Sequence, residues 1–179
     1  MKLAADGWVD AARRVLSPNR DERPAGAEVS LLLVHSISLP PGQFGGDSIE
    51  RFFTNTLDSS AHPYFQEISS LEVSAHFLVR RDGALIQFVP VHERAWHAGA
   101  SVWRGRPRCN DFSIGVELEG GDQGPFEAAQ YERLSELIHA LRERLPLHDV
   151  AAHSEVAPGR KTDPGPGFDW ARILAALAR

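Results

Sequence analysis

Short apolar runs bounded by turn residues dominate the first two thirds of the chain. Residues 30–36 form an almost continuous apolar run with His35 near its end, which predicts a strand buried on both faces. Residues 74–80 and 84–89 are separated by a turn that contains Asp-Gly, and this predicts a β-hairpin. Residues 112–119 alternate between apolar and small or acidic side chains, so they predict a strand with two different faces.

The last third of the chain changes to helical periodicity. Residues 127–145 predict the longest helix. Its apolar stripe consists of Tyr131, Leu134, Leu137, Ile138, Leu141 and Leu145. Shorter patterns predict helices over residues 48–57 and 168–178.

Between the last two predicted helices, residues 149–153 predict a short strand that ends in His153. Strands that alternate with helices and hairpins are typical of α/β proteins. We find no repeat or linker in the sequence. The pattern therefore predicts one α/β domain over residues 1–179, built on a mixed central β-sheet flanked by helices.

Composition and charge narrow the class of protein. The chain has 179 residues, of which 42% are hydrophobic and 24% charged, and its net charge is -5. A nucleic-acid partner is not expected, because nucleic-acid-binding domains are usually basic. No apolar run reaches the ~20 residues of a membrane span, and the N-terminus lacks the apolar core of a secretion signal. The cytoplasm is therefore the expected compartment. Cys109 is the single cysteine, so an intrachain disulfide is excluded.

Three residues form a candidate metal-ligand set. His35 and His153 each end a predicted strand, and Asp163 lies on the Pro/Gly-rich loop that follows His153. Two imidazoles and one carboxylate would leave a fourth position open, as in catalytic zinc sites. The alternative is that the histidines are hydrogen-bonded structural residues and that Asp163 caps a turn.

Two charged residues are candidates for proton transfer and charge stabilisation. Glu117 lies on the same predicted strand face as Glu119; it is either a solvated residue or a base facing a cleft at the strand end. Lys161 precedes Asp163 by two residues and is either a solvated lysine or a cation that stabilises an oxyanion.

Other residues with reactive or aromatic side chains have weaker context. His76 lies inside a predicted strand, which favours packing or a structural hydrogen bond. Trp96 and His97 lie on a loop that could line a cleft, although Trp96 could equally be a buried anchor. Arg108 and its neighbours Arg104 and Arg106 are either solvated or suited to an acidic ligand, because guanidinium pairs well with carboxylates.

Five motifs in a fixed order resemble one known family. They are residues 32–42 around His35, 74–83, 94–99, 109–120 and 161–166. Together they are similar to the zinc-dependent N-acetylmuramoyl-L-alanine amidases of the amidase-2 family, which are related to peptidoglycan recognition proteins. The resemblance extends from about Gly7 to Ala171 and is strongest to the cytoplasmic type that acts on anhydro-muropeptides.

This resemblance implies a role for each candidate residue. One Zn²⁺ per chain would be held by His35, His153 and Asp163, with a zinc-bound water as nucleophile. Glu117 would be the catalytic acid/base and Lys161 the oxyanion stabiliser. The residues expected to contact the substrate are Ser36, Tyr64, Trp96, His97 and Arg108.

The same resemblance implies cleavage of the amide between the lactyl group of (1,6-anhydro-)N-acetylmuramic acid and L-alanine. The setting would be cell-wall recycling in a Gram-negative bacterium, with a muropeptide as partner and a monomeric enzyme. Two positions depart from the pattern of close relatives: Ser36 stands where Asn is common, and Glu72 where Arg is common. The alternative function is a non-catalytic peptidoglycan-binding module, and a zinc peptidase of other specificity is a further competitor.

Overall fold

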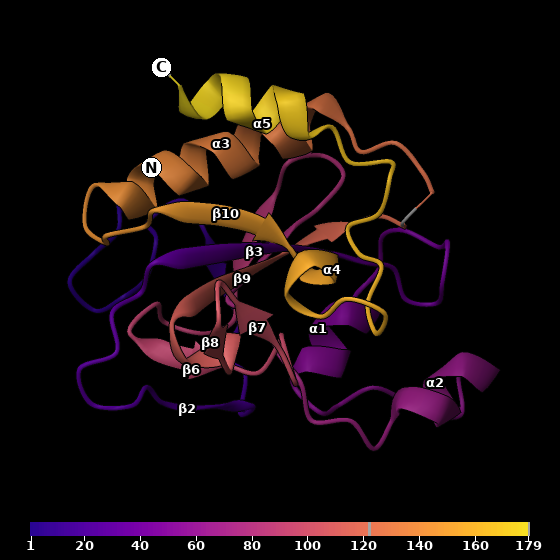
Figure 1. The fold of residues 1–179 in the computed structure, drawn as a ribbon. Helices are drawn as coiled ribbons and strands as arrows, with labels where there is room; N and C mark the ends of the chain where they lie inside the picture. Colours follow the sequence, from indigo (N-terminus) through magenta and orange to yellow (C-terminus); the bar gives the residue numbers. More distant parts are fainter. Residues whose placement is uncertain (122, 179) are drawn as a thin grey trace.

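A six-stranded mixed β-sheet forms the centre of the protein in the computed structural model, which describes residues 1–121 and 123–178 (Figure 1). The strand order is β1-β5-β4-β9-β3-β10. The bounds are β1 Arg13–Arg14, β3 Leu31–Ile37, β4 Phe77–Val79, β5 Leu85–Gln87, β9 Ser113–Glu119 and β10 Asp149–Ala152. All neighbouring pairs are parallel except the predicted hairpin β4–β5, which is antiparallel. The predicted fold class is confirmed.

Helices and loops cover both faces of this sheet. Helices α3 (Ala128–Arg142) and α5 (Trp170–Leu177) lie together on one side of it (Figure 1). Their apolar side chains share one core cluster with Leu32, Val34 and Ile114 from the central strands. A second cluster joins α1 (Ser48–Phe53) and α2 (Pro63–Ile68) to β4 and β5. Burial on both faces explains why the run from residue 31 to 34 is continuously apolar.

The register of β3 and β9 determines which polar side chains meet. His35 is the register partner of Glu117 on the neighbouring parallel strand. Along β9, Ile114, Val116 and Leu118 belong to the cluster under α3. Because side chains alternate along a strand, Glu117 points to the opposite face. His35 points to that face as well, since Val34 belongs to the α3 cluster.

Several short elements complete the fold and, like β1 and α2, were not predicted. They are the strands β2 (Arg20–Glu22), β6 (Glu93–Ala95), β7 (Val102–Trp103) and β8 (Arg106–Pro107), the 3₁₀ turn η1 (Cys109–Asp111) and the helix α4 (His153–Val156). Strand β2 pairs with β6, and β7 pairs with β8. No helix within the described ranges is both long and apolar enough to cross a membrane.

Several predicted boundaries are wrong by a few residues: β4 begins at Phe77 rather than 74, β5 ends at Gln87 rather than 89, and α5 begins at Trp170 rather than 168. Three further boundaries have a clear physical cause. Helix α1 ends at Phe53 rather than 57, because the Thr54 hydroxyl bonds the Glu50 carbonyl and Asn55 takes a positive φ of 59°. Helix α3 ends at Arg142 rather than 145, where the chain tightens into a turn ahead of a proline.

The third boundary concerns His153, which begins α4 instead of ending β10. The strand stops at Ala152 because the Glu155 carboxylate accepts a hydrogen bond from the Ala152 amide at 2.7 Å and caps the helix. His153 is therefore fixed by a helical turn as well as by the sheet.

Candidate active site

Three side chains that are far apart in the sequence converge at the carboxyl ends of β3 and β10. His35 Nδ1 lies 3.0 Å from His153 Nδ1 and 3.1 Å from Asp163 Oδ2, and His153 Nδ1 lies 3.0 Å from the same oxygen. The two histidines are only 1% and 3% exposed. The predicted ligand set thus forms a compact triangle of donor atoms.

The geometry and chemistry of this triangle fit a zinc ion. In a tetrahedral site with bonds of ~2.0–2.1 Å, neighbouring ligand atoms lie about 3.3 Å apart, close to the distances seen here. Both histidines have partners for their second ring nitrogen, as metal-binding imidazoles usually do. His35 Nε2 faces His97 Nδ1 at 2.9 Å, and His153 Nε2 faces the Ala98 carbonyl at 3.2 Å.

The electrostatic state of the ligands also suits a cation. Burial lowers the pKa of His35 to about 4, against the opposing effect of Asp163, so its imidazole is neutral at pH 7. Burial alone raises the pKa of Asp163, but hydrogen bonds with His153 and His35 outweigh it and hold that pKa below its usual value. Neutral imidazoles and an ionised carboxylate are the forms that bind metals.

Glu117 lies beside this triangle as a carboxylate with one unsatisfied oxygen. Its Oε2 is buried and has no hydrogen-bond partner among the residues that the structure describes. Burial raises the pKa of Glu117 well above its usual value, the nearby Asp163 charge raises it further, and Lys161 opposes both. The interpretation of Glu117 as a solvated residue is therefore wrong. A raised pKa is typical of carboxyl groups that exchange protons during catalysis.

A cavity of about 640 Å³ opens over these groups. Its lining includes all three ligands, Glu117 and Lys161. Of the residues expected to contact the substrate, Ser36, Tyr64, Trp96 and His97 also line it. A cleft of this size accommodates a ligand of several hundred daltons, and its polar floor lies at the strand ends.

Arg108 is the predicted substrate-contact residue that lies elsewhere. It lines a second, smaller depression with Arg106 and Pro107, and its exposed guanidinium pairs with Asp111 at 2.7 Å. Glu72, one of the two departures from the family pattern, is also exposed and outside the residues that line the main cavity.

The ring of His97 is directed at other side chains. Its Nδ1 faces His35, and its Nε2 lies 3.3 Å from Ser113 Oγ. The ring occupies the space over Gly115, where an added Cβ would lie 2.5 Å from His97 Cγ. His76 is a structural histidine, as predicted, because its Nδ1 accepts a hydrogen bond from the Gly115 amide.

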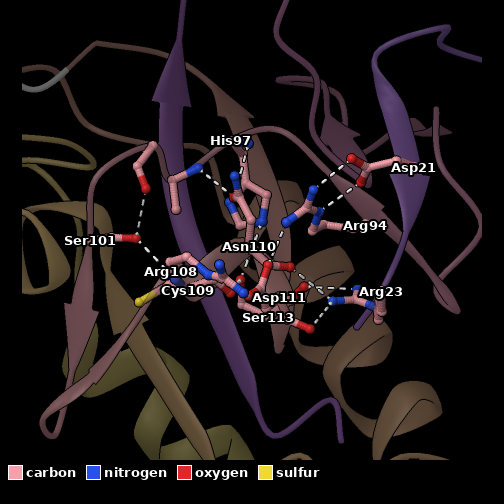
Figure 2. A network of polar contacts seen from close by, with 12 residues as sticks. Asp21, Arg23, Arg94, His97, Ser101, Arg108, Cys109, Asn110, Asp111 and Ser113 are labelled. Atoms are coloured by element: carbon pink, nitrogen blue, oxygen red, sulfur yellow. Dashed lines mark hydrogen bonds and ion pairs between the residues drawn. The ribbon is translucent and has the colours of Figure 1, made fainter. Parts of the chain in front are cut away.

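Two residues around the site were missed by sequence reasoning. Arg160 donates hydrogen bonds to the carbonyls of Ala98 and Ala100 at 2.6 and 2.7 Å. These bonds connect the loop that contains Lys161 to residues 98–100. Asn110 accepts hydrogen bonds from the backbone of residues 97 and 98 (Figure 2). The available signals were that Arg160 directly precedes Lys161 and that Asn110 lies within the motif of residues 109–120.

The fold and this arrangement define the class: an α/β protein with a candidate metal site and, beside it, a carboxyl group whose pKa is raised. The family model described as N-acetylmuramoyl-L-alanine amidase matches residues 25–166. The chain therefore belongs to the N-acetylmuramoyl-L-alanine amidase family.

Individual relatives agree over nearly the full length. The chain is 55% identical to the 1,6-anhydro-N-acetylmuramyl-L-alanine amidase AmpD of Citrobacter freundii over 98% of this chain and 95% of that protein. A crystal structure of an AmpD selenomethionine derivative matches with a TM-score of 0.96, 54% identity and coverage of 98% and 99% of the two chains. The Escherichia coli amidase AmiD, in complex with the substrate anhydro-N-acetylmuramic acid-L-Ala-D-γ-Glu-L-Lys, matches with a TM-score of 0.62 and 31% identity over 87% of this chain and 61% of that one.

Proposed function

We propose that this amidase is a zinc hydrolase that cleaves the amide between the lactyl group of (1,6-anhydro-)N-acetylmuramic acid and L-alanine of the stem peptide. The names of the AmpD relatives and the substrate in the AmiD complex support this choice of bond. The observation that carries the chemistry is the register pairing of His35 with Glu117. It puts a carboxylate, whose Oε2 has no partner in the described part of the chain, beside the donor triangle of His35, His153 and Asp163.

Each site residue has a separate role in the proposed amide hydrolysis. His35, His153 and Asp163 hold one Zn²⁺ per chain. When bound, zinc lowers the pKa of a coordinated water to about 7 and polarises a carbonyl oxygen. Glu117 takes a proton from the attacking water and delivers it to the nitrogen of the departing L-alanine amine. Lys161 donates to the oxygen that gains negative charge in the tetrahedral intermediate.

The cavity residues hold the muropeptide in place for this reaction. Trp96 and Tyr64 offer aromatic surface to the apolar face of the sugar, and Ser36 offers a short hydroxyl beside His35. Arg108 would meet a carboxylate of the stem peptide at the second depression, outside the main cavity, and His97 would contact the substrate as a residue of the cavity lining. Of these, Trp96 and Tyr64 are the contacts that the geometry supports best.

The proposed setting is the cytoplasm of a Gram-negative bacterium. AmpD relatives from Citrobacter and Escherichia support that source. There the enzyme would act as a monomer, with residues 1–179 as one domain, in the recycling of cell-wall fragments. Removal of the muropeptide would also reduce a signal for β-lactamase induction.

A single assay tests this function. Purified protein is incubated with anhydro-muropeptide, with and without a chelator and then with zinc restored, and the released stem peptide is measured by mass spectrometry. We expect release that the chelator abolishes and zinc restores. Absence of release from zinc-loaded protein would support the binding module instead. Cleavage of plain peptides alone would support a peptidase.

The binding module is the less favoured alternative because of Glu117. A buried carboxylate oxygen without a partner costs free energy, and a protein that only binds a muropeptide gains nothing from it. The complete ligand triangle argues in the same direction.

A further inference from the structure

The two imidazole ligands are held from behind by one short segment, residues 97 and 98. His35 Nε2 lies 2.9 Å from the ring of His97, and His153 Nε2 lies 3.2 Å from the carbonyl of Ala98. The ligands come from strand β3 and helix α4 and are 118 residues apart. Residues 97 and 98 therefore support both rings from behind, opposite the Asp163 oxygen that contacts both from the front.

The hydrogen bonds behind His35 fit only one assignment of protons. With Nδ1 turned toward the other ligands, His35 donates from Nε2 to His97 Nδ1. His97 must then donate from its own Nε2 to Ser113 Oγ at 3.3 Å, and Ser113 donates to the Cys109 carbonyl at 2.6 Å. Each donor meets one acceptor, and the chain of bonds fixes both the tautomer and the ring plane of His35.

Asn110 fixes the backbone of the same segment. Its Oδ1 accepts hydrogen bonds from His97 N at 3.2 Å and from Ala98 N at 2.8 Å (Figure 2). One side chain thus locates both the His97 ring behind His35 and the Ala98 carbonyl behind His153.

The turn that carries Asn110 is itself held rigidly. Arg23 donates to the carbonyls of Asn110 and Asp111 at 3.0 and 3.1 Å. Arg94 joins the Asp111 carboxylate to Asp21, with bonds of 2.6 Å to each (Figure 2). These bonds connect β2 and β6 to the turn that lies behind the two imidazole ligands.

We propose that Asn110 is a positioning residue that sets the metal affinity of the site by orienting His35 and His153 through residues 97 and 98. His97 is the direct intermediary for His35. This inference rests on the proposed zinc site. Outer supports of metal-binding histidines typically contribute ~10–100-fold to metal affinity, and here one amide oxygen supports two ligands.

The test measures zinc affinity of the full-length protein by competition with a chromophoric chelator, together with the visible spectrum after Co²⁺ substitution. Asn110→Ala is expected to weaken zinc binding by ~10–100-fold and to alter the Co²⁺ spectrum. Asn110→Asp keeps an acceptor oxygen at the same place, so it is expected to retain affinity within about threefold of the unaltered protein.

Gln130→Ala is the matched control. Gln130 is a buried amide that donates to the carbonyls of Val79 and Glu119 beneath α3, away from the ligands. It is expected to lower the thermal unfolding midpoint of the metal-free protein without changing zinc affinity. This pattern separates a positioning role from a general loss of stability.

The outcomes distinguish the two proposals. If the unaltered protein binds no zinc, the proposed function fails. If it binds zinc and a folded Asn110→Ala protein binds it equally well with the same Co²⁺ spectrum, the positioning role of Asn110 is wrong. Should Asn110→Ala not fold, Ser113→Ala decides, because it removes only the hydroxyl that fixes the His97 tautomer. It should weaken zinc binding by ~10-fold, the low end for such supports, and unchanged affinity would overturn the proposal.

Discussion

Glu117 and Glu119 are two carboxylates on the same face of β9, and they have opposite surroundings. Glu119 is 2% exposed and fully paired: Arg80 binds it at 2.8 Å, and the amides of Gly45 and Arg81 donate at 2.7 and 3.3 Å. Glu117 has a buried oxygen that is without a partner in the described residues. Two positions along one strand thus separate a paired, structural carboxylate from one whose pKa is raised.

The difference shows where the protein accepts an energetic cost. A buried, unsatisfied carboxylate oxygen is destabilising, and such groups cluster where chemistry needs a raised pKa. Glu119 instead fixes the loop of residues 39–46 that lines the cavity. The sequence alternation predicts that both side chains share a face. Which of the two carboxylates is paired with a cation and backbone amides depends on the surrounding loops.

Glu117→Gln should have the largest effect. It keeps the shape of the side chain but removes the proton acceptor, so kcat should fall by ~10²–10⁴-fold while zinc stoichiometry stays unchanged. Stem-peptide release and metal analysis of the same sample measure both. Turnover at the unaltered rate would remove Glu117 from the mechanism.

Lys161→Ala should have the next largest effect. Loss of a donor to a developing oxyanion typically costs ~10²–10³-fold in kcat, and zinc binding should be retained because Lys161 is not a ligand. Steady-state kinetics on anhydro-muropeptide give kcat and KM separately. A change confined to KM would show that Lys161 binds the substrate and does not stabilise charge.

Glu119→Gln should reduce stability rather than rate. It weakens the charge-assisted bonds to Arg80 and Gly45, which typically contribute ~1.5–3 kcal/mol each; in a chain of this size ~1 kcal/mol corresponds to about 2–4 °C in Tm. Thermal unfolding should therefore shift down by several degrees, with kcat within about threefold because proton transfer is untouched. A loss of kcat as large as that of Glu117→Gln would end the distinction between the two carboxylates.

The smallest effect concerns the pH dependence of stability in the metal-free protein. The pKa of Glu117 is raised by folding, so its stabilising contribution is present below the unfolded pKa of ~4.3 and is lost as pH rises toward the folded pKa. Relative to Glu117→Gln, the unaltered protein should lose a few degrees of Tm between about pH 4 and pH 7. Parallel Tm curves for the two proteins would show that Glu117 is not desolvated.

Local pattern was sufficient to predict the buried strand β3, the β4–β5 hairpin and helix α3. It was not sufficient for the register of β3 against β9, which depends on packing between distant segments and decides that His35 meets Glu117. Short elements such as α2 or β1 carry too few residues for a clear period. The ligand set followed from motifs in fixed order, because spacing alone left Asp163 open as a turn residue.

The role of the His97 ring could not be predicted for a different reason. The ring fits only because residue 115, on strand β9, is a glycine without a side chain. The sequence around His97 contains no sign of this distant contact. Arg108 illustrates the converse: its motif matches, but Asp111 draws its side chain to the outer depression. Contacts set by tertiary neighbours are the part that the sequence alone leaves open.

Titration of metal-free protein with zinc tests the central claim most directly. In the unaltered protein, muropeptide cleavage should rise in proportion to added zinc and level off at one equivalent per chain, whereas Asp163→Ala should neither retain zinc nor gain activity. Full activity before zinc is added, or one tightly bound zinc in Asp163→Ala, would contradict the assignment of His35, His153 and Asp163 as the metal site.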